Sequence, residues 1–174
     1  MGKIRGGGGW QAAETSQQRI KDTRKRRGEA AESVFLAKAV SMGFGVAKPW
    51  GDSERYDFIL DSGEKLWRVQ LKSAYVGSKE GGYTVHAFGN ESRVAYTAAE
   101  VDVVVGYVVP EQAWYVIPIG AFAGIKSMKL FPASRRMRSK HEKYREAWCW
   151  MCCGRAGMGV VRRCVAGAGC RVTG

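Results

Sequence analysis

The sequence predicts an α/β fold in which helices flank a mixed central β-sheet. Glu29 to about Met42 carries an apolar stripe at helical spacing. Tyr56 to Lys72 contains two short apolar stretches joined by a polar, glycine-containing turn, which is the pattern of a β-hairpin. Val101 to Val109 is a nearly continuous apolar run, as in a strand buried on both faces. Together, these three observations predict a helix packed on a sheet that contains both hairpin and buried strands.

The net charge of +12 is distributed unevenly over the 174 residues, which fit one domain with tails. Residues 1–28 carry eight Lys or Arg and two acids, and residues 134–174 carry ten and two. Residues 29–133 carry ten basic and twelve acidic residues, so a nearly neutral centre has basic flanks. Such flanks favour a polyanionic partner, most simply double-stranded DNA, although basic tails also serve solubility.

The N-terminal segment 1–26 is predicted to be a flexible basic leader, with the glycine run Gly6–Gly9 and no hydrophobic periodicity at its start. Two alternatives stay open for the polar, basic stretch Gln17–Arg27, namely a helical arm on DNA or disorder. The leader lacks the apolar segment of a secretory signal, and the chain has no run of about 18 apolar residues. We therefore expect a cytoplasmic protein without a membrane partner.

The first predicted helix, Glu29 to about Met42, buries a stripe through Ala31, Phe35 and Met42 and ends at glycines. Glu32 borders this stripe, as would an acid that points toward a site at the edge of the sheet. The alternative is a first-turn acid that only stabilises the helix N-terminus, and the pattern alone does not separate the two.

The hairpin turn determines which residues face each other. With its centre in the polar turn, Leu60 lies opposite Trp67, and Asp57 lies opposite Gln70. Opposed residues have Cβ atoms roughly 4.5–5.5 Å apart. Lys72 follows about 6.5 Å further along the face that it shares with Gln70. The hairpin therefore brings an acid, an amide and a lysine together.

This cluster of Asp57, Gln70 and Lys72 has the chemistry of a metal-assisted site that acts on phosphate. Carboxylate and amide oxygens are hard ligands that suit Mg²⁺. A lysine beside them orients or deprotonates an attacking water and offsets charge on a phosphate. The alternative is structural: Asp57 starts a strand, and the other two residues lie on a solvated face.

The other predicted elements are short. Strands are expected at Phe44–Lys48, Tyr83–Phe88 and Ala113–Ile117, the last one pairing antiparallel with the buried strand. Short helices are expected to begin at Thr97 and Ile119, and a basic helix is expected at Lys140–Trp148.

The stretch from about Arg27 to Phe122 resembles the PD-(D/E)XK nuclease superfamily. Within it, the chain is most similar to bacterial endonucleases associated with group I introns, and more distantly to archaeal Holliday junction resolvases. The matching segments are Gly28–Glu32, Pro49–Asp52, Arg55–Asp57, Val69–Ser73, Tyr96–Asp102 and Trp114–Pro118. The resemblance implies a restriction-endonuclease-like core for a nuclease domain at 27–148.

By this resemblance Asp57 is the main metal ligand, and Gln70, Leu71 and Glu32 belong to the same metal site. Lys72 is the catalytic lysine, and Glu32 is an accessory acid that reaches metal or water. The implied metal is Mg²⁺, with Mn²⁺ as a substitute. Gln70 departs from the commonest pattern, in which Glu or Asp stands at this position. A neutral amide weakens metal binding but keeps a coordinating oxygen.

The implied function is Mg²⁺-dependent hydrolysis of DNA phosphodiester bonds by metal-activated water, in an endonuclease of the homing type. The alternatives are a nuclease like the Holliday junction resolvases and a non-catalytic DNA-binding module on the same fold. Gln70 favours the non-catalytic module, whereas the intact Asp57 and Lys72 argue against it. A homo-oligomer, dimer or tetramer, is expected because two strands are cut. The side chains expected to contact DNA are Arg24, Lys25, Arg26, Arg27, Arg55 and Arg68.

The C-terminal segment 149–174 is rich in Cys, Gly and Arg, and lies outside the resemblance. We expect it to be disordered. It holds all five cysteines of the chain, Cys149, Cys152, Cys153, Cys164 and Cys170. A zinc site is an alternative, although the second pair is spaced too widely for a usual zinc knuckle.

Overall fold

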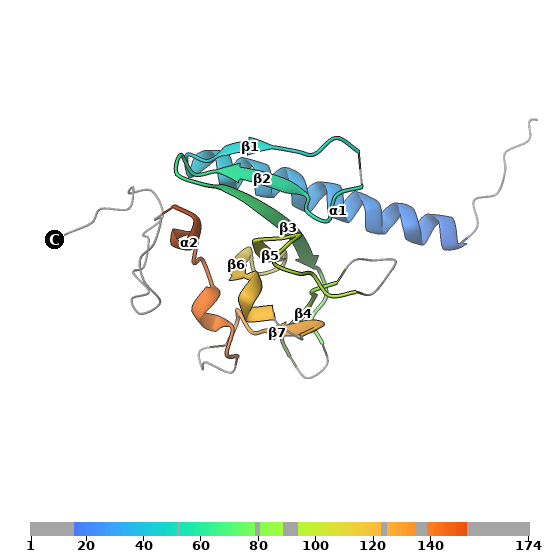
Figure 1. The fold of residues 1–174 in the computed structure, drawn as a ribbon. Coiled ribbons are helices and arrows are strands. Elements are labelled where there is room, and N and C mark those ends of the chain that lie inside the picture. The colour runs from blue at the N-terminus through green and yellow to red at the C-terminus, as the bar shows by residue number, and fades with distance from the viewer. Residues whose placement is uncertain are drawn as a thin grey trace, which may run out of the picture.

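The computed structural model describes residues 16–51, 53–78, 81–88, 94–122, 125–134 and 139–152. Helix α1 (Ser16–Ser41) lies along one face of a five-stranded sheet, and a two-stranded sheet lies on the other side of it (Figure 1). Within this described part, no helix combines the length and the apolar character that crossing a membrane requires.

The large sheet has the strand order β1-β2-β3-β5-β6. Its members are β1 (Gly45–Ala47), β2 (Phe58–Asp61), β3 (Leu66–Ala74), β5 (Val103–Val108) and β6 (Ala113–Pro118). Neighbours are antiparallel except β3 and β5, which pair in parallel from Val69–Val103 to Ala74–Val108. The prediction of an α/β fold with a mixed sheet is therefore confirmed.

The small sheet pairs β4 (Tyr83–His86) with β7 (Ser127–Leu130) in antiparallel fashion. Three short helices complete the described part: η1 (Ile119–Phe122), η2 (Glu142–Tyr144) and α2 (Cys149–Cys152). The predicted strand at Tyr83–Phe88 and the predicted short helix at Ile119 are both found. At Thr97 a hydrogen-bonded turn forms in place of a helix, although the Thr97 amide and hydroxyl both donate to the Glu100 carboxylate at 3.0 Å.

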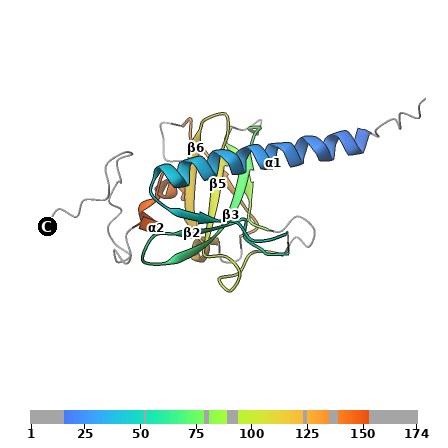
Figure 2. The same ribbon diagram turned by 90° about the horizontal axis from the view of Figure 1, so that it is seen from above.

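Helix α1 begins at Ser16, well before the predicted start at Glu29, so Gln17–Arg27 is helical, whereas its expected contact with DNA stays a prediction. The stretch lacks an apolar stripe, but it is composed largely of Gln, Arg and Lys, which have high helix propensity. Hydrophobic periodicity therefore detected only the half of the helix that packs on the sheet. The N-terminal half extends past the sheet (Figure 2). Residues 1–15 of the expected leader lie outside the described residues.

Two apolar cores lie on opposite faces of the large sheet. The first is between α1 and the sheet, where Phe35 is fully buried with its ring centroid 4.8 Å from that of Phe58. The second lies under β4 and β7 and includes Val85, Val104 and Leu130. Side chains of β3 alternate between the faces: Val69 and Leu71 join the first core. Gln70 and Lys72 consequently lie on the other face of this central strand.

The predicted basic helix Lys140–Trp148 is wrong. The chain forms only the short η2 and α2 there, and between them Glu146 has a positive φ of 48°, which a continuous α-helix does not allow. Tertiary packing outweighs helix propensity here, because Tyr144, Ala147 and Trp148 are all buried. Of the expected C-terminal tail, α2 covers Cys149–Cys152, and the remaining cysteines, with the alternative zinc site, lie outside the described residues.

Candidate active site

The register of the β2–β3 hairpin is the predicted one. Leu60 pairs with Trp67, and Phe58 pairs with Val69. The backbone N–H of Asp57 donates to the Val69 carbonyl at 2.9 Å, so the pairing continues one residue beyond β2. Asp57 therefore lies at the point where the chain enters the hairpin, next to the middle of β3.

Three polar groups meet at this point. Oδ2 of Asp57 accepts hydrogen bonds from Nε2 of Gln70 at 2.5 Å and from the backbone N–H of Leu71 at 2.8 Å. The same Nε2 also donates to the Leu71 carbonyl at 3.3 Å. The carboxylate and the carbonyl thus lie on either side of one amide group. An amide hydrogen carries partial positive charge, so this group occupies a position that favours a cation.

The donor set fits a hard divalent cation. Among the residues that the structure describes, no three His, Cys, Asp or Glu side chains gather into a metal cluster. The available oxygens are instead of three kinds: the Asp57 carboxylate, the Leu71 carbonyl and, after rotation of the amide by half a turn, Oε1 of Gln70. Oxygen ligands of these kinds suit Mg²⁺ and Mn²⁺.

Burial pushes Asp57 and Lys72 toward their neutral forms. It raises the pKa of the Asp57 carboxyl above its ordinary value, and the Leu71 N–H and the nearby Lys72 only partly offset this. Burial likewise lowers the pKa of the Lys72 ammonium, although the Asp57 charge opposes the change. An acid and a base whose pKa values both shift toward neutrality are the pattern of a site that transfers protons.

Tyr96, to which the sequence analysis gave no role, packs between two cations. The Lys72 ammonium lies 5.5 Å from the centroid of its ring, and the Arg55 guanidinium lies 4.9 Å from it. Burial and the negative charge of Asp57 raise the pKa of Tyr96 to about 12, so the phenol keeps its proton. The one signal in the sequence was that Tyr96 opens the matching segment Tyr96–Asp102. Arg55 also forms an ion pair of 3.4 Å with Glu100.

Glu32 faces the site from α1 and is held by a residue that sequence reasoning missed. Nζ of Lys48 lies 2.5 Å from Oε2 of Glu32, and this hydrogen bond raises the pKa of Lys48. The negative charges of Asp57 and Glu29 raise it further. The Glu32 charge also raises the pKa of Asp57, so the two carboxylates are close enough to interact. Only the position of Lys48, at the end of a predicted strand and before Pro49, hinted at it.

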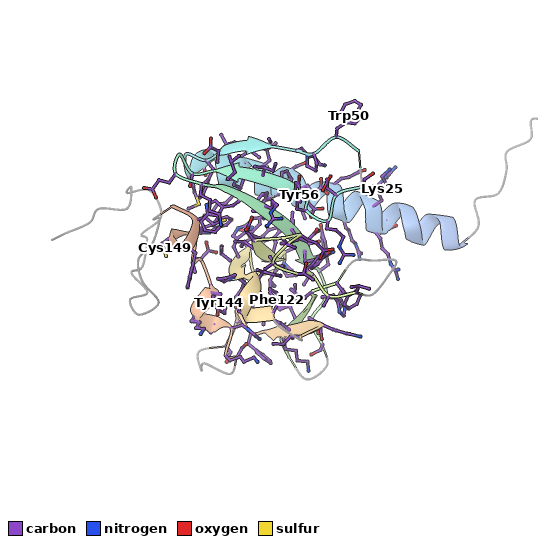
Figure 3. All side chains as sticks on the ribbon, viewed as in Figure 1. Lys25, Trp50, Tyr56, Phe122, Tyr144 and Cys149 are labelled. Carbon is purple, nitrogen blue, oxygen red and sulfur yellow. The ribbon has the colours of Figure 1, made fainter. Side chains whose placement is uncertain are left out.

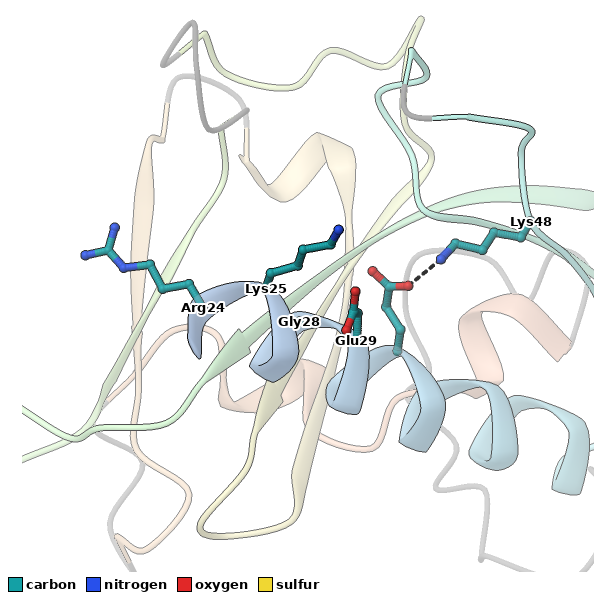
Figure 4. Close-up of a pocket in the computed structure, with 6 residues that line it drawn as sticks. Arg24, Lys25, Gly28, Glu29 and Lys48 are labelled. Atoms are coloured by element: carbon teal, nitrogen blue, oxygen red, sulfur yellow. Dashed lines mark hydrogen bonds and ion pairs between the residues drawn. The ribbon is translucent and has the colours of Figure 1, made fainter. Parts of the chain in front are cut away.

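An open pocket of about 530 Å³ adjoins this ion pair on the α1 side. Its lining is Arg24, Lys25, Gly28, Glu29, Glu32 and Lys48 (Figure 4). Two of the basic side chains expected to contact DNA therefore share a pocket with the expected accessory acid. Arg26 is exposed on the same helix. Arg27 lies against Tyr75, the residue directly after β3, with its guanidinium 5.2 Å from the centroid of the Tyr75 ring.

Arg68 does not join this cluster. Its backbone N–H and its Nε donate to Oδ2 of Asp102, at 2.9 and 3.1 Å. The guanidinium also donates to the carbonyls of Ala98 and Ala99. Arg68 therefore ties the start of β3 to the turn before β5, and its expected contact with DNA stays a prediction.

Comparisons with known proteins identify the family and support the fold. The family described as PD-(D/E)XK endonuclease matches residues 22–151. A solved structure of a bacterial homing endonuclease, I-Ssp6803I, superposes with a TM-score of 0.63 at 32% sequence identity. That match covers 74% of this chain and 90% of the homing endonuclease. No curated protein matches the chain.

Proposed function

Because this chain belongs to the PD-(D/E)XK endonuclease family, we propose that it is a Mg²⁺-dependent DNA endonuclease that hydrolyses phosphodiester bonds. The observation that carries the proposal is the convergence of the Asp57 carboxylate, the Gln70 amide and the Leu71 carbonyl within hydrogen-bonding distance of one another. The match to a protein described as a homing endonuclease favours the homing subtype for this chain as well.

Asp57, the Leu71 carbonyl and Oε1 of Gln70 would hold the metal ion, with Glu32 as an additional ligand for metal or water. Gln70 has to turn its amide over for this, because its nitrogen now donates to both neighbouring oxygens. The bound ion supplies a Lewis acid and a water of lowered pKa. A neutral glutamine leaves the site with one less negative charge than the commonest family pattern, so millimolar rather than tight metal binding is expected.

Lys72 orients the attacking water and accepts its proton, because burial lowers the pKa of its ammonium. Once protonated, it offsets the charge that builds up on the phosphate. Tyr96 keeps Lys72 in place by packing its ring against the ammonium. Lys48 holds Glu32 at the site through their ion pair.

DNA would approach along the side on which the basic half of α1 extends. Arg24, Lys25, Arg26 and Arg27 are all exposed there, and they would bind the phosphate backbone without reading its sequence. Arg55 borders the site and adds a further positive charge near the scissile phosphate. Two copies of the chain would be needed to cut both strands.

The test is cleavage of supercoiled plasmid, of a four-way junction and of a randomised-site duplex library, each with Mg²⁺ and with EDTA. Asp57→Asn keeps an acceptor for the Leu71 N–H but removes the charge that holds the metal, so it should abolish cutting. Asp61→Asn is the matched control, because Asp61 is an exposed acid at the other end of β2. Preference for the junction would indicate a resolvase-like enzyme. Binding to all three DNAs without any Mg²⁺-dependent cutting would overturn the proposal in favour of a non-catalytic module.

A further inference from the structure

Trp50 is the most exposed large apolar side chain of the described residues, at 100% of its accessible surface. It stands on the loop between β1 and β2 and points away from the body of the molecule (Figure 3). A tryptophan is ordinarily among the side chains that bury the most area in a protein or an interface. Its full exposure therefore indicates a surface that contacts something else.

The loop presents Trp50 in a defined direction. Pro49 fixes its own φ and restricts Lys48 before it to an extended conformation. Gly51 follows with φ of +71°, a left-handed conformation that favours glycine, so the chain turns directly after the tryptophan. The base of the loop is anchored because Lys48 is paired with Glu32 on α1. A preorganised loop loses less conformational entropy when it binds.

The surroundings of Trp50 favour a partner of negative charge. Lys48, two residues away, lines a pocket with Arg24 and Lys25; the acids Glu29 and Glu32 also line it, and Glu32 pairs with Lys48. The next residues of α1, Arg26 and Arg27, add two more exposed cations. A protein partner or a lipid surface would require a contiguous apolar patch, not one aromatic ring among cations. An aromatic ring beside basic side chains is the combination that binds nucleic acid, through stacking on bases and pairing with phosphates.

We propose that Trp50 packs its indole ring against the bases of bound DNA, next to the phosphates held by the basic half of α1. The inference rests on the proposed function, since that function supplies the DNA, but it concerns contact with bases and not cleavage. Phosphate contacts position a protein on DNA. The energy of packing a ring against the bases depends in addition on how easily neighbouring base pairs unstack, which varies with the DNA sequence. Trp50 would thus contribute to the choice of the site that is cut.

The experiment measures tryptophan fluorescence while a short random-sequence duplex is added in EDTA, where no DNA is cut. Trp50→Phe is compared with Trp150→Phe, whose ring is 36% exposed on α2 at the opposite end of the sheet (Figure 1). We expect DNA to quench the emission of the wild type and of Trp150→Phe, and to quench Trp50→Phe markedly less. Trp50→Ala should weaken binding of the duplex by roughly five- to a hundredfold. Because Trp50 is fully exposed, both of its variants should melt like the wild type.

Equal quenching in the two phenylalanine variants, or unchanged affinity in Trp50→Ala, would overturn the inference. This failure is distinct from failure of the proposed function. If the protein cuts plasmid with Mg²⁺ but DNA does not quench the fluorescence of Trp50, the proposed function is supported and the inference about Trp50 is wrong. If DNA quenches Trp50 but the protein never cuts, the inference is supported and the proposed function is wrong. A wild type that binds no duplex at all overturns both.

Discussion

Two charged clusters lie on the same face of β3, and the protein treats their charges in opposite ways. At the start of the strand, Arg68 and Asp102 form an ion pair of 3.1 Å. Their hydrogen bond raises the pKa of Arg68. Burial by itself would raise the pKa of Asp102, but the bonds from Arg68 and the charge of Lys65 outweigh it and lower that pKa. Both charged forms are therefore stabilised.

Four residues further along, burial decides the outcome. It raises the pKa of Asp57 and lowers that of Lys72, so both charged forms are destabilised. In the ion pair of Arg68 and Asp102 each charge is already compensated, so the pair gains little from binding a ligand, and it links β3 to the residue before β5. Carboxylate and ammonium groups that are half-buried without full compensation gain stability when a cation or a phosphate binds. The same strand thus carries two clusters whose pKa shifts run in opposite directions. The shifts of Arg68 and Asp102 are typical of a structural ion pair, and those of Asp57 and Lys72 are typical of the proposed active site.

The largest expected effect is on catalysis at the functional end. Lys72→Met should lower kcat by roughly 100- to 10,000-fold, because it removes the group that we propose accepts the proton of the attacking water. It should leave the free energy of unfolding unchanged or raise it, since a half-buried ammonium no longer has to be partly desolvated. Single-turnover cleavage and urea unfolding measure the two quantities. Lys126→Met, an exposed lysine before β7, is the control. Loss of stability together with activity would contradict the assignment.

The second expected effect is on stability at the structural end. Arg68→Met should lower the free energy of unfolding by about 2 kcal/mol, because Asp102 and two backbone carbonyls lose their charged donor. Cleavage per folded molecule should stay the same. Arg68→Lys keeps the charge but not the planar arrangement of several donors, so its free energy of unfolding should lie between those of the wild type and Arg68→Met. A large drop in kcat for Arg68→Met with unchanged unfolding would show that the two clusters are not separate.

Gln70→Glu adds a negative charge to the cluster of Asp57, Gln70 and Lys72, and so tests whether this cluster binds metal. The Mg²⁺ concentration that gives half-maximal cleavage should fall by about tenfold, since an anionic ligand replaces a neutral one. Without metal the variant should unfold more readily, because two carboxylates then share one buried space. Mn²⁺ binding measured without DNA provides a readout that does not depend on cutting. Unchanged metal affinity would remove Gln70 from the metal site.

The smallest expected effect concerns stability: the charges of Asp57 and Asp102 are expected to change the free energy of unfolding in opposite directions. The pKa of Asp57 is raised above its ordinary value of 3.8, so its charge destabilises the native state at neutral pH and ceases to do so in acid. The pKa of Asp102 is lowered below 3.8, so its charge stabilises the native state at neutral pH, and this is lost as the pH falls through the lowered value.

In EDTA, Asp57→Asn should therefore stabilise the protein at neutral pH, and Asp102→Asn should destabilise it. Both differences from the wild type should shrink as the pH is lowered below the ordinary carboxyl value. Urea unfolding across this pH range measures them. The same sign for both variants would mean that the two clusters do not differ in the way described.

Local pattern was enough to predict the hairpin, because its turn and its alternation fix the register that brings Asp57 to Gln70. It also predicted the doubly buried strand at Val101–Val109. The full length of α1 was not predictable from the apolar stripe, because the basic half of the helix has no such stripe and extends past the sheet. The predicted helix at Lys140–Trp148 is wrong because the tertiary packing that buries Trp148 and its neighbours outweighs the local helix propensity.

Within the candidate site, residues that meet through the hairpin could be predicted, whereas those that arrive from distant segments could not. Lys48 reaches Glu32 across the packing of β1 against α1. Tyr96 reaches Lys72 from the loop before β5. The pairing of Arg68 with Asp102 was not predictable either, because the two residues lie 34 positions apart in the chain. Each of these depends on tertiary contacts that no local spacing encodes.

The parallel pairing of β3 with β5 has a consequence for the order in which the protein folds. Asp57 and Gln70 are joined by a short hairpin, which closes at a small cost in chain entropy. Val69 and Val103 are far apart in the chain, so their pairing closes a long loop and is expected to come later. The oxygen atoms of the proposed metal site are thus expected to come together early. The burial that lowers the pKa of Lys72 is expected to be completed later, once β5 has paired with β3, so the proposed ligands would meet before this pKa is shifted.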